Sequence, residues 1–113
     1  MPTMPYDEAL AARVRRALMS APSITERKMM GALCFMTSGN MFCSVTGFAL
    51  MIRIGAHAYA EAVGQHGVGP MAIAGRAMKA FVLIDPDISQ SDAALVEWVN
   101  RGLNFAATLP PKR

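Results

Sequence analysis

This chain of 113 residues has no long apolar run, and its N-terminal stretch lacks the pattern of an export signal. No apolar run approaches the ~18 residues that a membrane-spanning helix needs, so we expect no transmembrane segment. The N-terminal stretch includes Asp7 and Glu8 and has no basic region followed by an apolar one, so we expect no signal peptide. Proteins without an export signal usually keep their cysteines reduced. We therefore expect a cytoplasmic protein that does not bind membranes.

The residue patterns that hold metals or perform catalysis are also missing. The two cysteines, Cys34 and Cys43, are nine residues apart, and neither a CxxC nor an HxxxH spacing occurs. Asp85 and Asp87 flank a proline, which is typical of a turn and not of paired catalytic carboxylates. We therefore expect a protein that is not an enzyme and that needs no metal and no cofactor.

Concentrated positive charge is missing as well. The formal net charge is +3, but Lys112 and Arg113 lie in a proline-rich tail, so the rest of the chain is close to neutral. Proteins that bind nucleic acid without regard to sequence usually carry a concentrated basic surface. Direct nucleic-acid binding is therefore a second hypothesis, supported by the arginines at 13, 15 and 16 in the predicted first helix.

What the sequence does contain is typical of one ordered globular domain, with 53% apolar and 17% charged residues. We expect this domain to cover 1–113, with an ordered core at about 6–109 and a tail at 110–113. Hydrophobic periodicity and turn residues predict a helix between 5 and 21, strands at 24–30, 33–36, 41–45 and 48–54, a helix at 57–63, a loop at 65–70, a hairpin of 71–74 and 78–84, and a helix from Ser91 to about 107.

This order of elements also predicts the fold class. The connections between the first strands are too short for parallel crossovers, so these strands must be antiparallel. The prediction is an α+β domain with an antiparallel sheet of about five to six strands and helices at the N-terminus, in the middle and at the C-terminus.

The segment from Cys34 to Cys43 has almost the same sequence in both directions, Cys-Phe-Met-Thr-Ser-Gly-Asn-Met-Phe-Cys. A two-residue turn at Ser38 and Gly39 would pair each residue with its like, so that Cys34 lies opposite Cys43. All four sulfur side chains would then share one face of the hairpin and both phenylalanines the other. Two registers remain open beside this favoured one, because a turn one residue later or a three-residue loop ending at Gly39 shifts the pairing in either direction.

Cys34 and Cys43 are therefore a candidate thiol pair. In the favoured register their Cα atoms would be ~4.5–5.5 Å apart, which a disulfide tolerates. Two thiols and two thioethers would also suit a soft ion such as Cu(I), and a redox switch would need an exposed thiol of low pKa. Ordinary core packing competes with all three, and we favour it because Cys and Met are among the residues most often buried.

Five basic residues within or beside the predicted strands form a candidate surface for a partner or an anion. They are Arg27, Lys28, Arg53, Arg76 and Lys79. If the strands that carry them are neighbours, their charges converge and favour an acidic partner. Dispersed, solvated charges are the alternative.

Four strings of the sequence point to a family. They are Lys28-Met29-Met30-Gly31-Ala32, Phe35-Met36 through Asn40-Met41-Phe42-Cys43, Gly75-Arg76-Ala77-Met78-Lys79, and Trp98-Val99 to Leu109-Pro110. Together they resemble the N-terminal domain of the TfoX/Sxy competence regulators, over nearly the whole chain, as in a single-domain member. One departure is Ala32, which stands where the family often has the second glycine of Met-Phe-Gly-Gly.

The resemblance implies a compact α+β domain with a fold similar to that of secretion chaperones. It also implies a link to competence or transcription regulation, which full-length regulators perform with a second, C-terminal domain. We therefore expect a small regulatory or protein-interaction module whose partner is another protein or a second copy of this chain.

Overall fold

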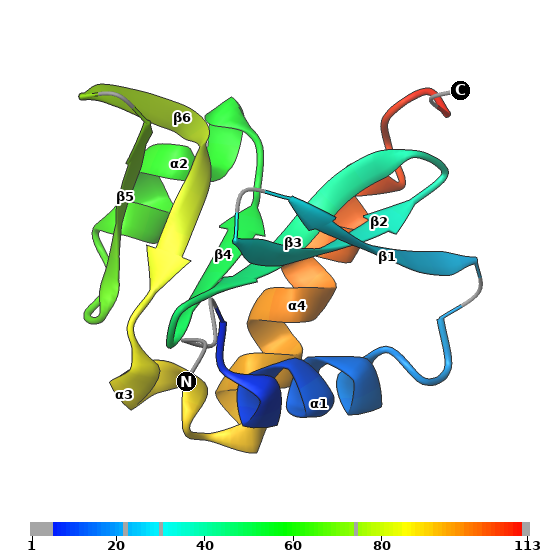
Figure 1. Cartoon of the computed structure of the whole chain (residues 1–113). Helices are drawn as coiled ribbons and strands as arrows, with labels where there is room; N and C mark the ends of the chain where they lie inside the picture. The colour runs from blue at the N-terminus through cyan, green and yellow to red at the C-terminus, as the bar shows by residue number, and fades with distance from the viewer. Residues whose placement is uncertain (1–5, 22, 30, 74, 112–113) are drawn as a thin grey trace.

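A computed structural model describes residues 6–21, 23–29, 31–73 and 75–111 of the chain. The elements in chain order are α1 (Glu8–Ala17), β1 (Ile24–Met29), β2 (Ala32–Thr37), β3 (Asn40–Thr46), β4 (Ala49–Arg53), α2 (Ala56–Val63), β5 (Val68–Ile73), β6 (Arg76–Ile84), α3 (Pro86–Ser89) and α4 (Asp92–Ala106). Figure 1 shows this α+β arrangement, which confirms the predicted fold class. None of these helices is long and apolar enough to cross a membrane.

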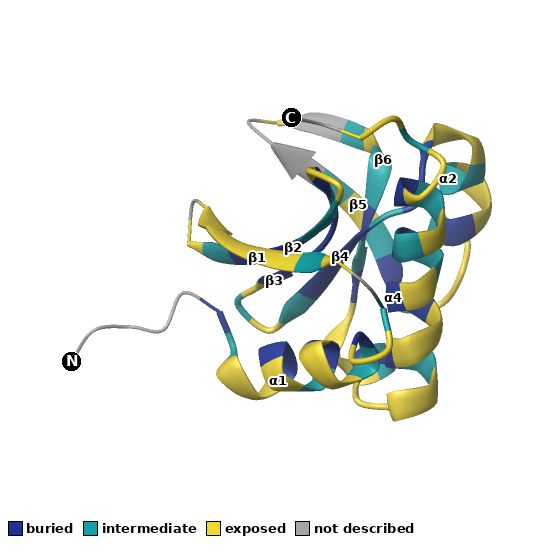
Figure 2. Ribbon diagram, turned by 90° about the vertical axis from the view of Figure 1, so that its right-hand side faces the viewer, coloured by how far each residue is buried: buried dark blue, intermediate teal, exposed yellow. Residues whose placement is uncertain are grey.

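The six strands form one antiparallel sheet in the order β1-β2-β3-β4-β6-β5. The sheet is twisted, and β1 and β5 at its two edges run in clearly different directions in Figure 1. The helices lie on one side of the sheet, where α4 packs on β3 and β4 and α2 packs on β5 and β6. Figure 2, turned by 90°, shows the helices on one side of the sheet and no helix on the other side.

Helix α1 begins where a side chain can cap it. Asp7 accepts a hydrogen bond from the backbone N–H of Ala9 at 3.3 Å, which satisfies one of the free donors at the helix start. Leu10, Val14 and Leu18 recur every four residues and therefore form an apolar stripe on one side of the helix, and all three are buried in the core.

Helix α4 follows the same rules. Ser91 caps it by accepting a hydrogen bond from the backbone N–H of Ala94 at 3.3 Å. Leu95, Trp98 and Val99 are buried and pack against the sheet as part of the main hydrophobic core, whereas Leu103 and Phe105 are only partly buried. The apolar faces of the two helices therefore fix which side of the sheet is covered.

The predicted turn between β2 and β3 is confirmed. Ser38 and Gly39 have φ angles of 50° and 79°, the positive values that a two-residue type I′ turn requires. The first two cross-strand pairs after the turn follow the favoured register and end with Met36 opposite Met41.

The register then shifts by one residue, so the predicted pairing of Cys34 with Cys43 is wrong. Phe42 is an extra residue in a β-bulge, and Phe35 therefore pairs with Cys43 while Cys34 pairs with Ser44. Phe35, Phe42 and Cys43 are all completely buried in the main core. The bulge lets two consecutive residues of β3 face the helices, which strict alternation does not allow.

Two further elements differ from the prediction. β5 begins at Val68, so the predicted loop at 65–70 is shorter than expected. Pro70 is tolerated in this strand because β5 lies at the edge of the sheet. The short helix α3 occupies the predicted turn, since Pro86 has the fixed φ that favours the first helical position.

Candidate functional site

The side of the sheet without helices is the candidate docking surface, and we call it the open face. Antiparallel cross-strand partners point to the same side, and the row of Leu33, Val45 and Leu50 belongs to the core on the helix side. Their neighbours along each strand must therefore point away from the helices. By this criterion the open face contains Thr25, Arg27 and Met29 of β1, Cys34 and Met36 of β2, Met41, Ser44 and Thr46 of β3, Ala49, Met51 and Arg53 of β4, and Phe81 and Leu83 of β6.

The centre of the open face is apolar and tightly packed. Cys34, Ser44, Met51 and Leu83 are successive cross-strand partners, and they form a row over β2, β3, β4 and β6. The first three are only 4%, 3% and 2% exposed, although no helix lies over them. Ser44 is the one polar member of the row, and its hydroxyl lies 3.3 Å from that of Thr46. The open face therefore has a well-packed apolar centre.

Charge is divided unequally between the sheet and the rest of the chain. The six strands contain five basic residues and a single acidic one, Glu26. Glu26 faces the helices, where its two carboxylate oxygens accept hydrogen bonds from Arg15 at 2.7 and 2.9 Å. The other acidic residues all lie in helices and connections. The open face is consequently basic, although the domain as a whole is close to neutral.

The structure brings only some of the predicted basic residues onto one surface. Strand alternation assigns Arg27 and Arg53 to the open face, but the guanidinium of Arg53 lies beside Phe105 of α4, at the border between the two sides of the sheet. β1 and β4 are also three strand spacings apart, which is about 14 Å in a flat sheet. Lys79 is exposed on β6, two residues before Phe81. These charges are too far apart to hold one small anion together, and instead they border the apolar centre.

The remaining two predicted residues do not belong to the described open face. Lys28 lies opposite Leu33, a core residue, and therefore points to the helix side at the exposed edge of the sheet. Arg76 begins β6, but its side chain lies outside the described residues.

Arg53 has an unusual environment at one end of the open face. The pairing of β3 with β4 ends at Cys43 and Ile52, so the next residue of β4 has no partner on β3. Nη1 of Arg53 instead donates a long hydrogen bond of 3.4 Å to the backbone oxygen of Met41. Its guanidinium carbon lies 5.6 Å from the centre of the Phe81 ring and 5.8 Å from that of Phe105. The side chain is half-buried among aromatic rings.

The two cysteines do not form the predicted pair. Cys43 belongs to the core on the helix side, whereas Cys34 lies on the open face beside Ser44. Burial raises the pKa of Cys43 well above the usual thiol value, and burial also raises that of Cys34, partly offset by the Ser44 hydroxyl. Both thiols are therefore protonated at neutral pH, unlike the thiolate of a redox switch. Within the described ranges, no three His, Cys, Asp or Glu side chains gather as metal ligands.

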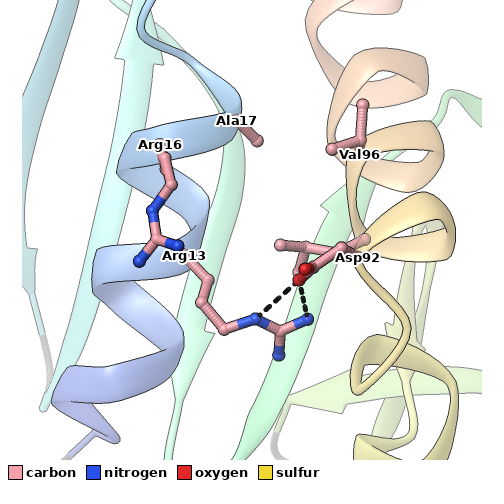
Figure 3. A pocket seen from close by; sticks show the side chains of 6 residues that line it. Arg13, Arg16, Ala17, Asp92 and Val96 are labelled. Atoms are coloured by element: carbon pink, nitrogen blue, oxygen red, sulfur yellow. Dashed lines mark hydrogen bonds and ion pairs between the residues drawn. The ribbon is translucent and has the colours of Figure 1, made fainter.

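A groove of about 190 Å³ lies between α1 and α4 on the helix side (Figure 3). Arg13 reaches across it to Asp92, with a nitrogen–oxygen distance of 2.8 Å. Figure 3 shows Arg16 staying over α1 while Ala17 and Val96 face each other across the groove. Because its crossing charges neutralise each other and its apolar walls are small, this groove is the weaker candidate for a docking site.

Sequence reasoning found the basic residues of the sheet but missed the apolar row that they border. The sequence predicts that Met51 and Leu83 lie in strands, but it does not predict that they share the open face, because this depends on the register of four strands. The signal that was available is charge segregation, since Glu26 is the only acid in all the strands. Phe48, which is 70% exposed at the turn between β3 and β4, was also not singled out.

Comparison with known proteins places this geometry in a family. Residues 16–106 match the family model of the TfoX N-terminal domain, a range that runs from the last two residues of α1 through the end of α4. No curated protein and no solved structure is matched by the chain. The match includes every strand and the whole open face, and the chain belongs to the TfoX N-terminal domain family.

Proposed function

We propose that this domain is a cytoplasmic, non-enzymatic regulatory module that binds a partner protein on its open face. One observation carries the proposal: a helix-free sheet face combines a packed apolar centre, basic residues around it and no acidic strand residue. Membership of the TfoX N-terminal domain family supports a regulatory role of the competence type. A role in transcription control would then be indirect and mediated by the bound protein.

The chemistry of the open face specifies its partner. A segment with apolar side chains would contact the partly exposed apolar residues of the open face, such as Met36, Met41 and Leu83. Its acidic side chains would meet Arg27 and Arg53. Complementary charges at the border of an interface set its specificity and its association rate. A second copy of this chain would bring two basic faces together, so a symmetric dimer through this surface is disfavoured.

Nucleic acid fits the same face less well. Surfaces that bind single strands combine basic residues with several exposed aromatic rings for base stacking, and Phe81 is the one aromatic residue of the open face. The arginines of α1, which first suggested nucleic-acid binding, are partly engaged, since Arg13 binds Asp92 and Arg15 binds Glu26. We therefore expect an acidic protein segment as the occupant.

Site-specific photo-crosslinking in producing cells tests this proposal. A crosslinking residue at Thr25 or Thr46 samples the open face, and one at Ala12 or Asn100 is the exposed control on the helix side. We expect protein crosslinks from the two open-face positions, and peptide sequencing should locate them beside Asp or Glu and apolar residues of one partner. Equal crosslinking from the helix positions, crosslinks to this chain itself, or crosslinks to nucleic acid would overturn the proposal.

A further inference from the structure

Arg53 is a half-buried cation for which the described part of the chain supplies no carboxylate. The ion pairs there join Arg13 to Asp92, Arg15 to Glu26 and Arg101 to Glu61, and Arg53 takes part in none of them. Arginine is seldom buried without a paired acid, because removing a charge from water is costly unless an opposite charge or good hydrogen bonds replace the water.

The hydrogen bonds of this guanidinium are also incomplete. Nη1 donates to the Met41 oxygen at 3.4 Å, a distance at the long end for a hydrogen bond. Nε is buried and has no hydrogen-bond partner, and Nη2 has none among the described residues. Nη2 is not among the buried unpartnered atoms, so its N–H groups can bind an acceptor from outside the chain.

Aromatic rings account for only part of the stabilisation. Phe81 and Phe105 lie within 6 Å of the guanidinium carbon, at 5.6 and 5.8 Å, where their ring faces attract a cation. The rings do not neutralise the positive charge of the guanidinium, and they provide no hydrogen-bond acceptor for its free N–H groups. The guanidinium between the start of β3 and the end of β4 thus has no counter-ion among the described residues.

We propose that Arg53 is an anion-binding residue that takes one carboxylate or phosphate group from outside the chain. Because Nε is buried, the anion meets the guanidinium end-on at its Nη1 and Nη2 edge. Charge-assisted bonds of this kind are about twice as strong as neutral ones. The inference deepens the proposed function, since in a complex on the open face the anion is an Asp or Glu of the partner, and Arg53 then anchors that partner more strongly than the exposed Arg27.

Thermal unfolding of the isolated protein tests the site without the partner. The melting temperature is followed in low-salt buffer during separate titrations with sodium acetate, sodium phosphate and, as a control for ionic strength, sodium chloride. A ligand that binds only the folded state raises this temperature, and we expect a saturating rise of about 4 °C or more beyond the chloride control. A response to acetate identifies carboxylate as a ligand, and a response to phosphate alone identifies a phosphate group as the ligand.

Variants assign the response to one side chain. Arg53→Met should abolish the rise, Arg53→Lys should reduce it because a lysine lacks the planar fork, and Arg27→Met should leave it unchanged. If Arg53→Met does not fold, NMR of the unaltered protein takes the place of this variant. During the anion titration we expect a saturating shift of the Nε–H signal of Arg53 and no such shift for Arg27. The inference is overturned if neither anion acts beyond chloride, or if Arg53→Met responds like the unaltered protein. If neither anion acts beyond chloride, the crosslinking test of the open face can still succeed, so the two proposals can fail separately.

Discussion

A β-carbon added to Gly102 of α4 would stand only 2.7 Å from the backbone oxygen of Phe42 in β3. The helix therefore rests directly on the bulged strand, with Ile52 as the next contact at 3.1 Å. Gly→Ala in a helix usually stabilises a protein by roughly 0.5–1 kcal/mol. At Gly102 the added methyl group would push against the backbone of β3. We therefore expect Gly102→Ala to lower the free energy of unfolding in urea by about 1–3 kcal/mol.

Gly64→Ala is the matched control for this prediction. Gly64 follows α2 with ordinary α-helical angles, and an added β-carbon would meet backbone oxygens only at 3.5 and 3.6 Å. We expect this variant to be as stable as the unaltered protein or slightly more stable. Equal stabilities for the two alanine variants would contradict the close approach of α4 to the bulge.

The two cysteines should differ in their tolerance of serine. Cys43→Ser places a hydroxyl among core side chains, and an unpaired buried hydroxyl costs about 1–3 kcal/mol. Cys34→Ser lies opposite the Ser44 hydroxyl, which can pair with it, so we expect a loss below about 1 kcal/mol. Urea unfolding under reducing conditions measures both variants, and the opposite order would contradict the assignment of the two faces.

Mild oxidation provides a second check on the same register. Because Cys34 and Cys43 point to opposite faces, we expect no disulfide between them in the folded protein. Mass spectrometry after treatment with oxidised glutathione should therefore show no loss of two hydrogens. That loss in protein that remains folded would instead support the palindromic pairing.

The ion pair between Arg15 and Glu26 should make stability depend on acid pH. Hydrogen bonding to Arg15 lowers the pKa of Glu26 below its usual 4.5. A group whose pKa is lower in the folded state stabilises that state above the unfolded pKa, and this contribution disappears as the pH falls through the folded pKa. Both side chains are partly exposed, at 43% and 35%, so we expect only a few tenths of a kcal/mol.

Glu26→Gln tests this linkage. Its unfolding free energy, measured between about pH 6 and pH 2, should fall less steeply below about pH 4.5 than that of the unaltered protein. Arg15→Gln should flatten the profile in the same way, because it removes the cause of the lowered pKa. An unchanged slope in both variants would show that the pair adds nothing to stability in solution.

Most elements of the fold could be predicted because their signals are local. The stripe of Leu10, Val14 and Leu18 and the cap at Ser91 place the first and last helices, and Ser38-Gly39 places the first hairpin turn. The bulge at Phe42 could not be predicted in this way. It depends on the packing of α4 against β3, which joins residues far apart in the chain.

The candidate site depends on long-range pairing even more strongly. The basic strand residues were identifiable in the sequence, but the face that each one occupies follows from the register across the sheet. Arg53 illustrates this limit, since its unpaired guanidinium results from the end of the β3–β4 pairing and from two rings on other elements. A charge count along the sequence shows neither feature.

The affinity of the crosslinked partner for charge-reversed variants tests the central claim most directly. Arg27→Glu alters the open face, and Arg16→Glu is a matched reversal of an exposed arginine on the helix side. We predict that titration calorimetry shows at least about a tenfold loss of affinity, ~1.4 kcal/mol, for Arg27→Glu and less than about a twofold change for Arg16→Glu. Reversing the partner's contacting acid to lysine should recover the loss. A loss for Arg16→Glu that equals or exceeds the loss for Arg27→Glu, or no loss for Arg27→Glu, would contradict binding on the open face.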